Sequence, residues 1–299
     1  MSSFTHDGLV VIDKPSGMTS HDVVARVRRI FKTRRVGHGG TLDPMATGLL
    51  VIGINNGTKA LSFISSASKS YAATIRLGAT TVTDDAEGEQ VSVTDASHVT
   101  DEQIRTALAA MVGEIDQVPS SVSAIKVNGE RAYAKVRAGE EVKLEPRRVQ
   151  IHSIDVTAIF RAGPFVEVDV TVHCGSGTYI RAIARDLGAT LGVGGHLTML
   201  RRVESSGFTE KDAVELESAA KGFQPLRKAL SHFMPAAKVS DEQIAFVMRG
   251  QRLPWVFGDA SQSIAVVDSK DQLLAIGHFV EENGKPMLGY HSVFNNEAK

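Results

Sequence analysis

The sequence predicts an α+β fold, in which helices flank a mixed, largely antiparallel sheet and a small β-rich domain follows. Three observations support this prediction. Hydrophobic residues make up 42% and charged residues 22% of the 299 positions, as in an ordinary globular protein. Apolar and polar residues alternate in some segments and follow a helical period in others. After Met234-Pro235 the pattern changes to short strands separated by polar turns, so we expect one domain over residues 1–232 and a second over 235–299.

The first half of the chain contains three predicted strands and two predicted helices. Each strand is a short apolar run or alternates apolar with polar residues, and the first ends at the turn Lys14–Gly17. The first helix has an apolar stripe of Val23, Val27 and Ile30, and the second has one of Ile104, Leu108 and Met111. In chain order these elements are the strand Gly8–Asp13, the helix from Thr19 or Ser20 to Phe31, the strands Leu50–Ile54 and Ser70–Leu77, and the helix Asp101–Met111.

The second half begins with an insertion at about residues 119–147, which is rich in cations and poor in apolar residues. We therefore expect it to leave the core. The alternating segments Val149–Ile159 and Phe165–Cys174 predict strands, and Tyr179–Leu187 predicts a helix after a glycine turn. The β-rich domain is expected to include the strands Ser263–Val267 and Leu273–His278.

Charge is segregated along the chain although the formal net charge is only -1. The stretch Asp13–Lys59 carries a formal charge of +5, and the stretch Gly78–Glu102 carries -7. A nearly neutral protein can therefore present a basic face to a polyanion. The alternative is that Arg26–Arg35 is simply the solvated side of a helix.

Several classes of protein are excluded by composition. No apolar run reaches the roughly 18 residues of a membrane span, and the polar N-terminus does not resemble a signal peptide. The single cysteine, Cys174, allows neither an internal disulfide nor a cysteine-rich metal site, so we expect a small buried residue there and a reducing cytoplasm as the compartment.

The segment Val36–Lys59 contains the most informative residues. Gly37, Gly39 and Gly40 allow close approach of another molecule, and Pro44 biases Asp43 toward an extended loop. The segment has neither a metal-ligand pair nor a phosphate-loop pattern. Asp43 is thus either a carboxylate displayed for chemistry or the acceptor of an Asx-turn.

This segment closely resembles the catalytic segment of the TruB family of pseudouridine synthases, which isomerise the T-loop uridine at position 55 of tRNA. Further motifs of that family stand before and after this segment, in the family's order, between about Gly8 and Phe208. The matching residues are Lys14–Ser20; His38–Pro44 with Ala46 and Gly48–Leu50; Lys69, Tyr71, Leu77, Gly78, Thr81, Thr83, Asp85 and Gly88; Ser123, Ala124, Lys126, Gly129 and Tyr133; Gly177–Arg181 and Arg185–Gly188; and Leu200–Arg202. The last segment of the chain weakly resembles a PUA-like domain.

The resemblance implies that Asp43 is the catalytic carboxylate of a cofactor-free isomerisation without metal. Asp43 would attack C6 of the base or C1′ of the ribose, or remove the 2′ proton, and the sequence leaves these routes open. Arg181 would be its ion-pair partner, and Tyr71, Tyr179 and Leu200 would support the pocket. For Tyr71, a core aromatic is the alternative.

The resemblance also implies that the target base is flipped out of the tRNA T stem-loop, with His38 beside the vacated position. Lys14, Lys59 and, in the RNA-gripping insertion, Lys126 would contact phosphates. Asp85 would lie near the RNA. The alternatives are a capping role for His38 and a turn role for Asp85. No protein partner is implied, and we expect a monomer. A tRNA-folding chaperone and a synthase acting on another RNA remain alternatives for the whole chain.

Overall fold

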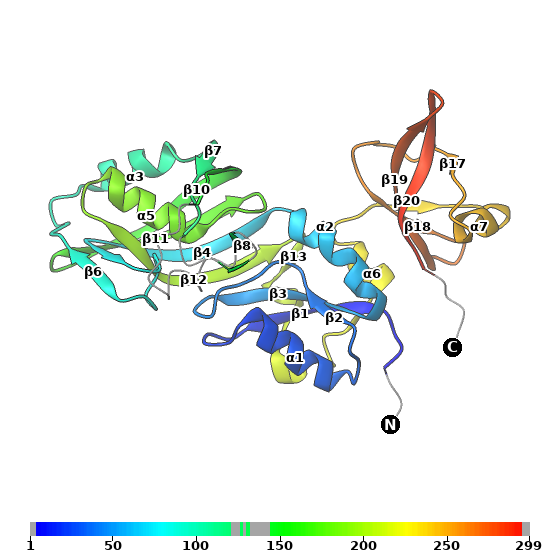
Figure 1. Cartoon of the computed structure of the whole chain (residues 1–299), viewed down its shortest axis with the longest axis horizontal. Helices are drawn as coiled ribbons and strands as arrows, with labels where there is room; N and C mark the ends of the chain where they lie inside the picture. The colour runs from blue at the N-terminus through cyan, green and yellow to red at the C-terminus, as the bar shows by residue number, and fades with distance from the viewer. Residues whose placement is uncertain (1–3, 121–125, 128–129, 132–143, 295–299) are drawn as a thin grey trace.

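The computed structural model describes residues 4–120, 126–127, 130–131 and 144–294, which form two lobes (Figure 1). The larger lobe contains the N-terminus and is built on one long sheet, and the smaller lobe is formed by the C-terminal strands. Most of the predicted insertion, including the side chain of Lys126, lies outside the described residues. The described backbone there pairs as a short hairpin of β8 (Lys126–Val127) and β9 (Glu130–Arg131).

The long sheet confirms the predicted mixed, largely antiparallel arrangement. Its main path is β14-β1-β3-β12-β4-β11-β10-β7, and only the pairs β1–β14 and β3–β12 are parallel among the described strands of this sheet. Its strands are β1 (Gly8–Lys14), β2 (Val36–His38), β3 (Thr47–Ile54), β4 (Lys69–Leu77), β7 (Gly113–Gln117), β10 (Arg147–Ala162), β11 (Phe165–Cys174), β12 (Gly195–Ser205), β13 (Phe208–Thr209), β14 (Ala213–Glu215) and β15 (Gln224–Pro225). A separate hairpin pairs β5 (Ala79–Thr81) with β6 (Gln90–Val93).

Two of the longer helices begin at a capping residue that the sequence supplies. Thr19 caps α1 and Thr100 caps α3, each through a capping box with the third helical residue. None of the described helices is both long and apolar enough to cross a membrane. The helices are α1 (Ser20–Ile30), α2 (Leu61–Ser66), α3 (Asp101–Ala109), α5 (Ile180–Thr190), α6 (Leu226–Leu230) and α7 (Asp241–Met248), with 3-10 turns η1 (Asn55–Ala60), η2 (Glu210–Asp212) and η3 (Leu216–Ser218).

The alternation in β4 and β11 places every second side chain in the main core. Tyr71, Ala73 and Ile75 of β4 face inward, and α5 covers them with residues such as Ile183 and Leu187. The same alternation places Ser70 and Thr74 on the opposite, polar face, where they contact charged residues of neighbouring strands. Residues that share the inner face of β4 can therefore reach the pocket described below.

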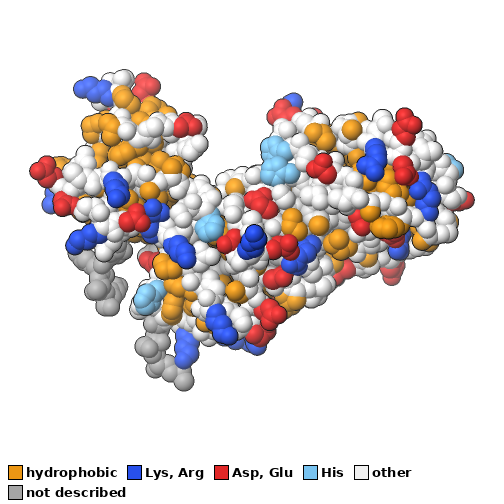
Figure 2. Space-filling view, turned by 180° about the vertical axis from the view of Figure 1, so that it is seen from behind, with side chains coloured by type: hydrophobic (Ala, Val, Ile, Leu, Met, Phe, Trp, Pro, Cys, Tyr) orange, Lys and Arg blue, Asp and Glu red, His pale blue; other side chains and the backbone are white. Residues whose placement is uncertain are grey.

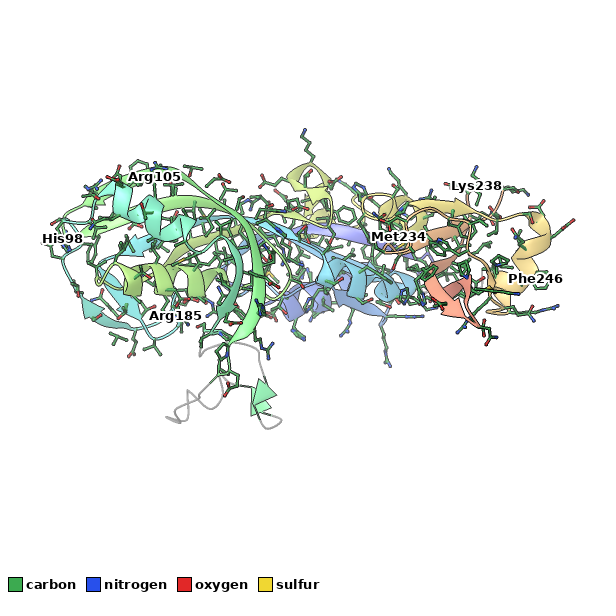
Figure 3. The ribbon with its side chains drawn as sticks, turned by 90° about the horizontal axis from the view of Figure 1, so that it is seen from above. His98, Arg105, Arg185, Met234, Lys238 and Phe246 are labelled. Atoms are coloured by element: carbon green, nitrogen blue, oxygen red, sulfur yellow. The ribbon has the colours of Figure 1, made fainter. Side chains whose placement is uncertain are left out.

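The smaller lobe is β-rich, as the sequence predicts, and its sheet is largely antiparallel. Its order is β16-β18-β19-β20-β17, and it is joined to the larger lobe by a shared apolar cluster in which Leu49 and Phe208 meet Val267 and Phe294. Met234 belongs to this cluster and lies between the lobes (Figure 3). From behind, hydrophobic side chains gather on the smaller lobe (Figure 2). Its strands are β16 (Ala236–Lys238), β17 (Leu253–Pro254), β18 (Ile264–Val267), β19 (Leu273–Glu282) and β20 (Lys285–Val293).

The observed elements are longer than predicted in several places. β3 begins three residues before the predicted Leu50, and β10 extends to Ala162 rather than ending at Ile159. Strand β12 has two register irregularities against β4, and only its Leu200–Arg202 motif stands out in the sequence. Bulges break the strict alternation on which a prediction from sequence depends.

Candidate active site

A cavity of about 250 Å³ lies where the loop before β3, the start of α5 and the inner faces of β4 and β12 meet. Five of the predicted site residues line it together: Asp43, Tyr71, Tyr179, Arg181 and Leu200. The other lining residues are Gly40, Thr41, Leu42, Ser65, Lys69, Gly177, Thr178, Ile180 and Arg202. Segments that are far apart in the sequence therefore build one site.

The loop that carries Asp43 is fixed on both sides of this residue. Ser20 of α1 donates from its hydroxyl to the Leu42 carbonyl at 3.1 Å and accepts from the Leu42 N–H at 2.9 Å. The Ala46 N–H donates to the Asp43 carbonyl at 3.1 Å, which closes a tight turn around Pro44. Gly40 has a φ of 97°, in the left-handed region that favours glycine. The turn uses the backbone carbonyl of Asp43 and not its carboxylate, which an Asx-turn would use, so the carboxylate is left to pair with Arg181.

Lys14 holds this loop in place from the protein interior. Its side chain is fully buried, and its ammonium donates to the carbonyls of Pro15 at 2.9 Å, Met18 at 2.6 Å and Pro44 at 3.1 Å. Burial lowers the pKa of Lys14 from 10.5 to about 8. Its ammonium faces the protein interior rather than solvent. The phosphate contact of Lys14 stays a prediction, and this geometry favours a positioning role.

Arg181 joins two carboxylates at the cavity. Its Nε lies 3.1 Å from Asp43 Oδ2, and its Nη1 lies 3.3 Å from Asp85 Oδ2 and donates to the Thr83 carbonyl at 3.0 Å. Only 5% of the Arg181 side chain and 3% of the Asp85 side chain are exposed. Asp85 also accepts from the Thr83 hydroxyl and the Glu87 N–H. Asp85 therefore lies behind Arg181 and fixes its orientation, which agrees with the alternative of a turn residue better than with contact to RNA.

Asp43 has an environment suited to a reactive carboxylate. Burial raises its pKa, and the Arg181 guanidinium opposes this by stabilising the ionised form. Its side chain is 36% exposed, so the carboxylate lies at the mouth of the cavity rather than at its base. A carboxylate held ionised in this way can act as a nucleophile or as a base.

Tyr71, Leu200 and Arg202 form the deeper wall. Tyr71 and Leu200 are 8% and 6% exposed, and Arg202 is 1% exposed. Arg202 donates from Nε to the Leu49 carbonyl at 2.7 Å and from Nη2 to the Gly40 carbonyl at 3.2 Å. Burial raises the pKa of Tyr71, and the adjacent Arg202 guanidinium opposes that rise. In the pairing of β4 with β12, Tyr71 lies opposite Arg202 and Leu200 lies opposite Ala73, so an aromatic and an aliphatic side chain both line the cavity.

Tyr179 is placed by a residue that the sequence does not single out. Gln117 at the end of β7 is 2% exposed, donates to the Tyr179 carbonyl at 3.1 Å and accepts from the Tyr179 N–H at 2.8 Å. A single glutamine gives no periodic or motif signal, so only the fold reveals this role. Nearby, Arg185 of α5 donates to the Val118 carbonyl at 2.8 Å, on the side from which β8 and β9 project (Figure 3).

Lys69 is a second buried cation, which the sequence marks only as part of a motif. Its ammonium donates to the carbonyls of Ile64 at 3.3 Å, Ser65 at 3.0 Å and Ala67 at 2.7 Å, at the end of α2. Burial, together with the nearby Arg202 guanidinium, lowers its pKa to about 8.

The remaining predicted RNA contacts lie outside the cavity lining. His38 precedes the catalytic loop and packs its ring against His21 at 5.6 Å, and burial lowers its pKa. Lys59 donates to the Val293 carbonyl at 3.1 Å and lies 4.9 Å from the Phe294 ring centre, so it joins the two lobes. The roles of His38 and Lys59 in binding RNA stay predictions.

Other chemistry-bearing groups do not converge here. Cys174 is buried, and burial raises its thiol pKa to about 11. Within the part of the chain that the structure describes, no group of three His, Cys, Asp or Glu side chains is arranged to hold a metal ion.

Comparison with known proteins identifies the family. The family model "TruB family pseudouridylate synthase (N terminal domain)" matches residues 28–180, and "tRNA pseudouridylate synthase B C-terminal domain" matches residues 181–231. A protein of Arthrobacter sp. (strain FB24) named tRNA pseudouridine synthase B is 55% identical over 88% of this chain and 87% of its own. One of Mycobacterium sp. (strain KMS) with the same name is 61% identical over 71% of this chain and 72% of its own.

Solved structures agree with this assignment. A structure of an H/ACA RNP bound to a substrate RNA containing 2′-deoxyuridine has a TM-score of 0.71 at 25% identity, over 96% of this chain and 85% of that one. A Cbf5-Nop10-Gar1 complex has a TM-score of 0.71 at 26% identity, over 96% of this chain and 84% of that one. By its sequence, its fold and the convergence of its motif residues on one cavity, the chain belongs to the TruB family of pseudouridylate synthases.

Proposed function

We propose that this enzyme converts the T-loop uridine of tRNA, position 55, to pseudouridine, with Asp43 starting the reaction. The observation that carries the proposal is the ion pair of Asp43 with the buried Arg181, at the mouth of a cavity walled by Tyr71 and Leu200. A reactive carboxylate at the opening and a flat slot beyond it match a nucleoside whose ribose stays near the surface while its base enters.

The reaction explains why a single carboxylate is sufficient. The bond between N1 and C1′ breaks, the base turns, a bond forms between C5 and C1′, C5 loses its proton, and N1 takes up a proton, so that atoms and charge balance. No group is gained from another molecule and no redox change occurs. Asp43 attacks C6 or C1′, or takes the 2′ proton, and Arg181 keeps it ionised for any of these roles.

Access to the base requires that it leave the RNA loop, which costs a few kcal/mol. His38 lies next to the catalytic loop and is suited to stack at the vacated position. Exposed arginines continue from α1 toward His38 and supply contacts to phosphates: Arg26, Arg28, Arg29, Arg34 and Arg35. These contacts favour a folded tRNA arm over an isolated nucleoside.

A synthase acting on another RNA is the second candidate, because the solved neighbours include an H/ACA RNP. The relatives at 49–61% identity are all named tRNA pseudouridine synthase B, which favours tRNA. A folding chaperone would not need the ion pair of Asp43 and Arg181 at the mouth of such a cavity.

The test uses a T-arm hairpin RNA labelled with tritium at C5 of its uridines. Wild-type protein should release tritium from the target position without any guide RNA, whereas Asp43→Asn should bind the hairpin and release none, because an amide is a poor nucleophile and base. Release only after a guide RNA is supplied would assign the other substrate class. If both proteins bind the hairpin and neither releases tritium, the result would favour the folding chaperone.

A further inference from the structure

Arg202 is a cation that the proposed reaction does not yet use. It is 1% exposed, and it donates to the neutral carbonyls of Leu49 and Gly40. Among the residues that the structure describes, no carboxylate forms an ion pair with its guanidinium. Buried arginines are rarely left without an acidic partner.

Arg202 differs in this lack of a described acidic partner from its neighbour Arg201 on β12. Successive side chains of a strand point to opposite faces, so Arg201 and Arg202 diverge. Arg201 pairs with Asp13 at 2.9 Å and with Glu210 at 2.7 Å, away from the cavity lining. Arg202 lines the cavity and, among the described side chains, has no such acidic partner. Arg202 therefore lines the cavity beside Tyr71, to which it hydrogen-bonds, and no described carboxylate neutralises its charge.

The other cations of the lining are already engaged. Arg181 is paired with Asp43 and Asp85, and the three N–H donors of the Lys69 ammonium are directed at three carbonyls. Arg202 has five N–H donors and gives two of them to carbonyls. Arg202 is thus the lining cation suited to meet a negative charge inside the cavity.

The burial of Arg202 indicates which part of the nucleotide would bring a negative charge to it. Asp43 lies at the mouth with 36% of its side chain exposed, whereas Arg202 is on the buried wall with Tyr71 and Leu200. A phosphate remains on the RNA strand outside the mouth, and the base is the part of the nucleotide that reaches this wall.

Resting on the proposed function, we propose that Arg202 stabilises the negative charge that develops on the uracil ring during the reaction. If N1–C1′ breaks first, the bonding electron pair stays on N1 and spreads over the two ring carbonyls. If Asp43 adds to C6 instead, the electron pair of the C5–C6 double bond moves toward the C4 carbonyl. The ring becomes anionic in each case, so the role of Arg202 does not depend on the route. A preorganised cation at such a site is typical of electrostatic catalysis.

The first experiment compares single-turnover tritium release by wild type, Arg202→Met, Arg202→Lys and Arg201→Met. Arg202→Met should slow release about 100- to 1000-fold, as removal of a donor to a developing anion does in other enzymes. RNA affinity should change less than about threefold, and Arg202→Lys should recover part of the rate because it keeps a charge. Arg201→Met should match wild type, since Arg201 pairs with acids outside the cavity.

The second experiment separates charge stabilisation from a structural role. A 5-fluorouridine at the target position already stabilises negative charge on the ring, so it needs Arg202 less. Consumption of this nucleoside, measured after complete digestion of the RNA, should show a deficit for Arg202→Met at least about tenfold smaller than with uridine. If Arg202→Met does not fold, the deficits with uridine and with 5-fluorouridine are compared for Arg202→Lys instead.

The outcomes are distinct. Equal losses of affinity and rate would overturn the proposal in favour of a phosphate contact. A deficit that is the same for both bases would overturn it in favour of packing, and so would a wild-type rate for Arg202→Met. Failure of the wild type itself to release tritium would instead refute the proposed function.

Discussion

Replacing Arg181 with methionine should destabilise the fold through Asp85 more than through Asp43. Asp85 is 3% exposed and would be left as a buried carboxylate without its cation, a change that typically costs about 3–5 kcal/mol. Loss of the bond from Arg181 to the Thr83 carbonyl adds about 1 kcal/mol. Asp43 is 36% exposed, so water screens its charge and it contributes little. We expect the free energy of unfolding to fall by about 4 kcal/mol.

Urea denaturation of a double-mutant cycle tests this assignment. Arg181→Met with Asp85→Asn removes the uncompensated charge as well as the cation, so it should recover about half of the lost stability. The reasoning fails if the free energy of unfolding of Arg181→Met lies within about 1 kcal/mol of the wild-type value. It also fails if adding Asp85→Asn lowers that free energy further.

The same substitution should change the pH dependence of turnover. Burial raises the pKa of Asp43 and Arg181 opposes the rise, so removing Arg181 moves that pKa further up. The ionised carboxylate then forms only at higher pH, and the acid limb of tritium release should shift to higher pH in Arg181→Met. An unshifted limb, with affinity and rate reduced equally, would mean that Arg181 contacts phosphate only.

Three further predictions concern stability and binding. The pKa of Lys14 is about 8 in the folded protein and 10.5 in the unfolded chain, so between these pH values the unfolded chain binds more protons. The free energy of unfolding should therefore rise with pH over this range. Denaturation curves of Lys14→Met should show a smaller rise of that free energy. Phe294→Ala should lower the free energy of unfolding by about 3 kcal/mol while calorimetry still shows one transition, because the lobes share a core; two separated transitions in wild type would contradict this. Neutralising Arg26, Arg29 and Arg34 with glutamine should weaken hairpin binding and reduce its salt slope by about one for each phosphate that these arginines neutralise; an unchanged slope would restore the solvated-helix interpretation.

The fold could be predicted where the sequence has a clear local period. The alternation in β4 and β11 located both strands and put Tyr71 on the inner face, and Thr19 marked the start of α1. The motifs likewise identified Asp43 and Arg181, whose proximity only the structure establishes.

The positions of the buried cations could not be predicted in the same way. Lys14 resembles a surface lysine in sequence, and its burial depends on carbonyls that converge from Pro15, Met18 and Pro44. Lys59 reaches Val293 across 234 residues of sequence, so no local pattern signals that contact. Long-range backbone acceptors leave no mark in the sequence, since every residue supplies a carbonyl.

The cations around the cavity also explain why position 202 has arginine. Lys14 and Lys69 are 0% and 6% exposed, and their pKa values fall to about 8 because burial and the Arg202 guanidinium both disfavour their charged forms. Each lysine is therefore about half neutral near pH 8. A lysine at position 202 would be subject to the same burial, so it would keep only part of the charge that arginine keeps, which agrees with a partial recovery of the rate by Arg202→Lys. A guanidinium does not deprotonate in proteins, so arginine keeps a full positive charge on this wall throughout the working pH range.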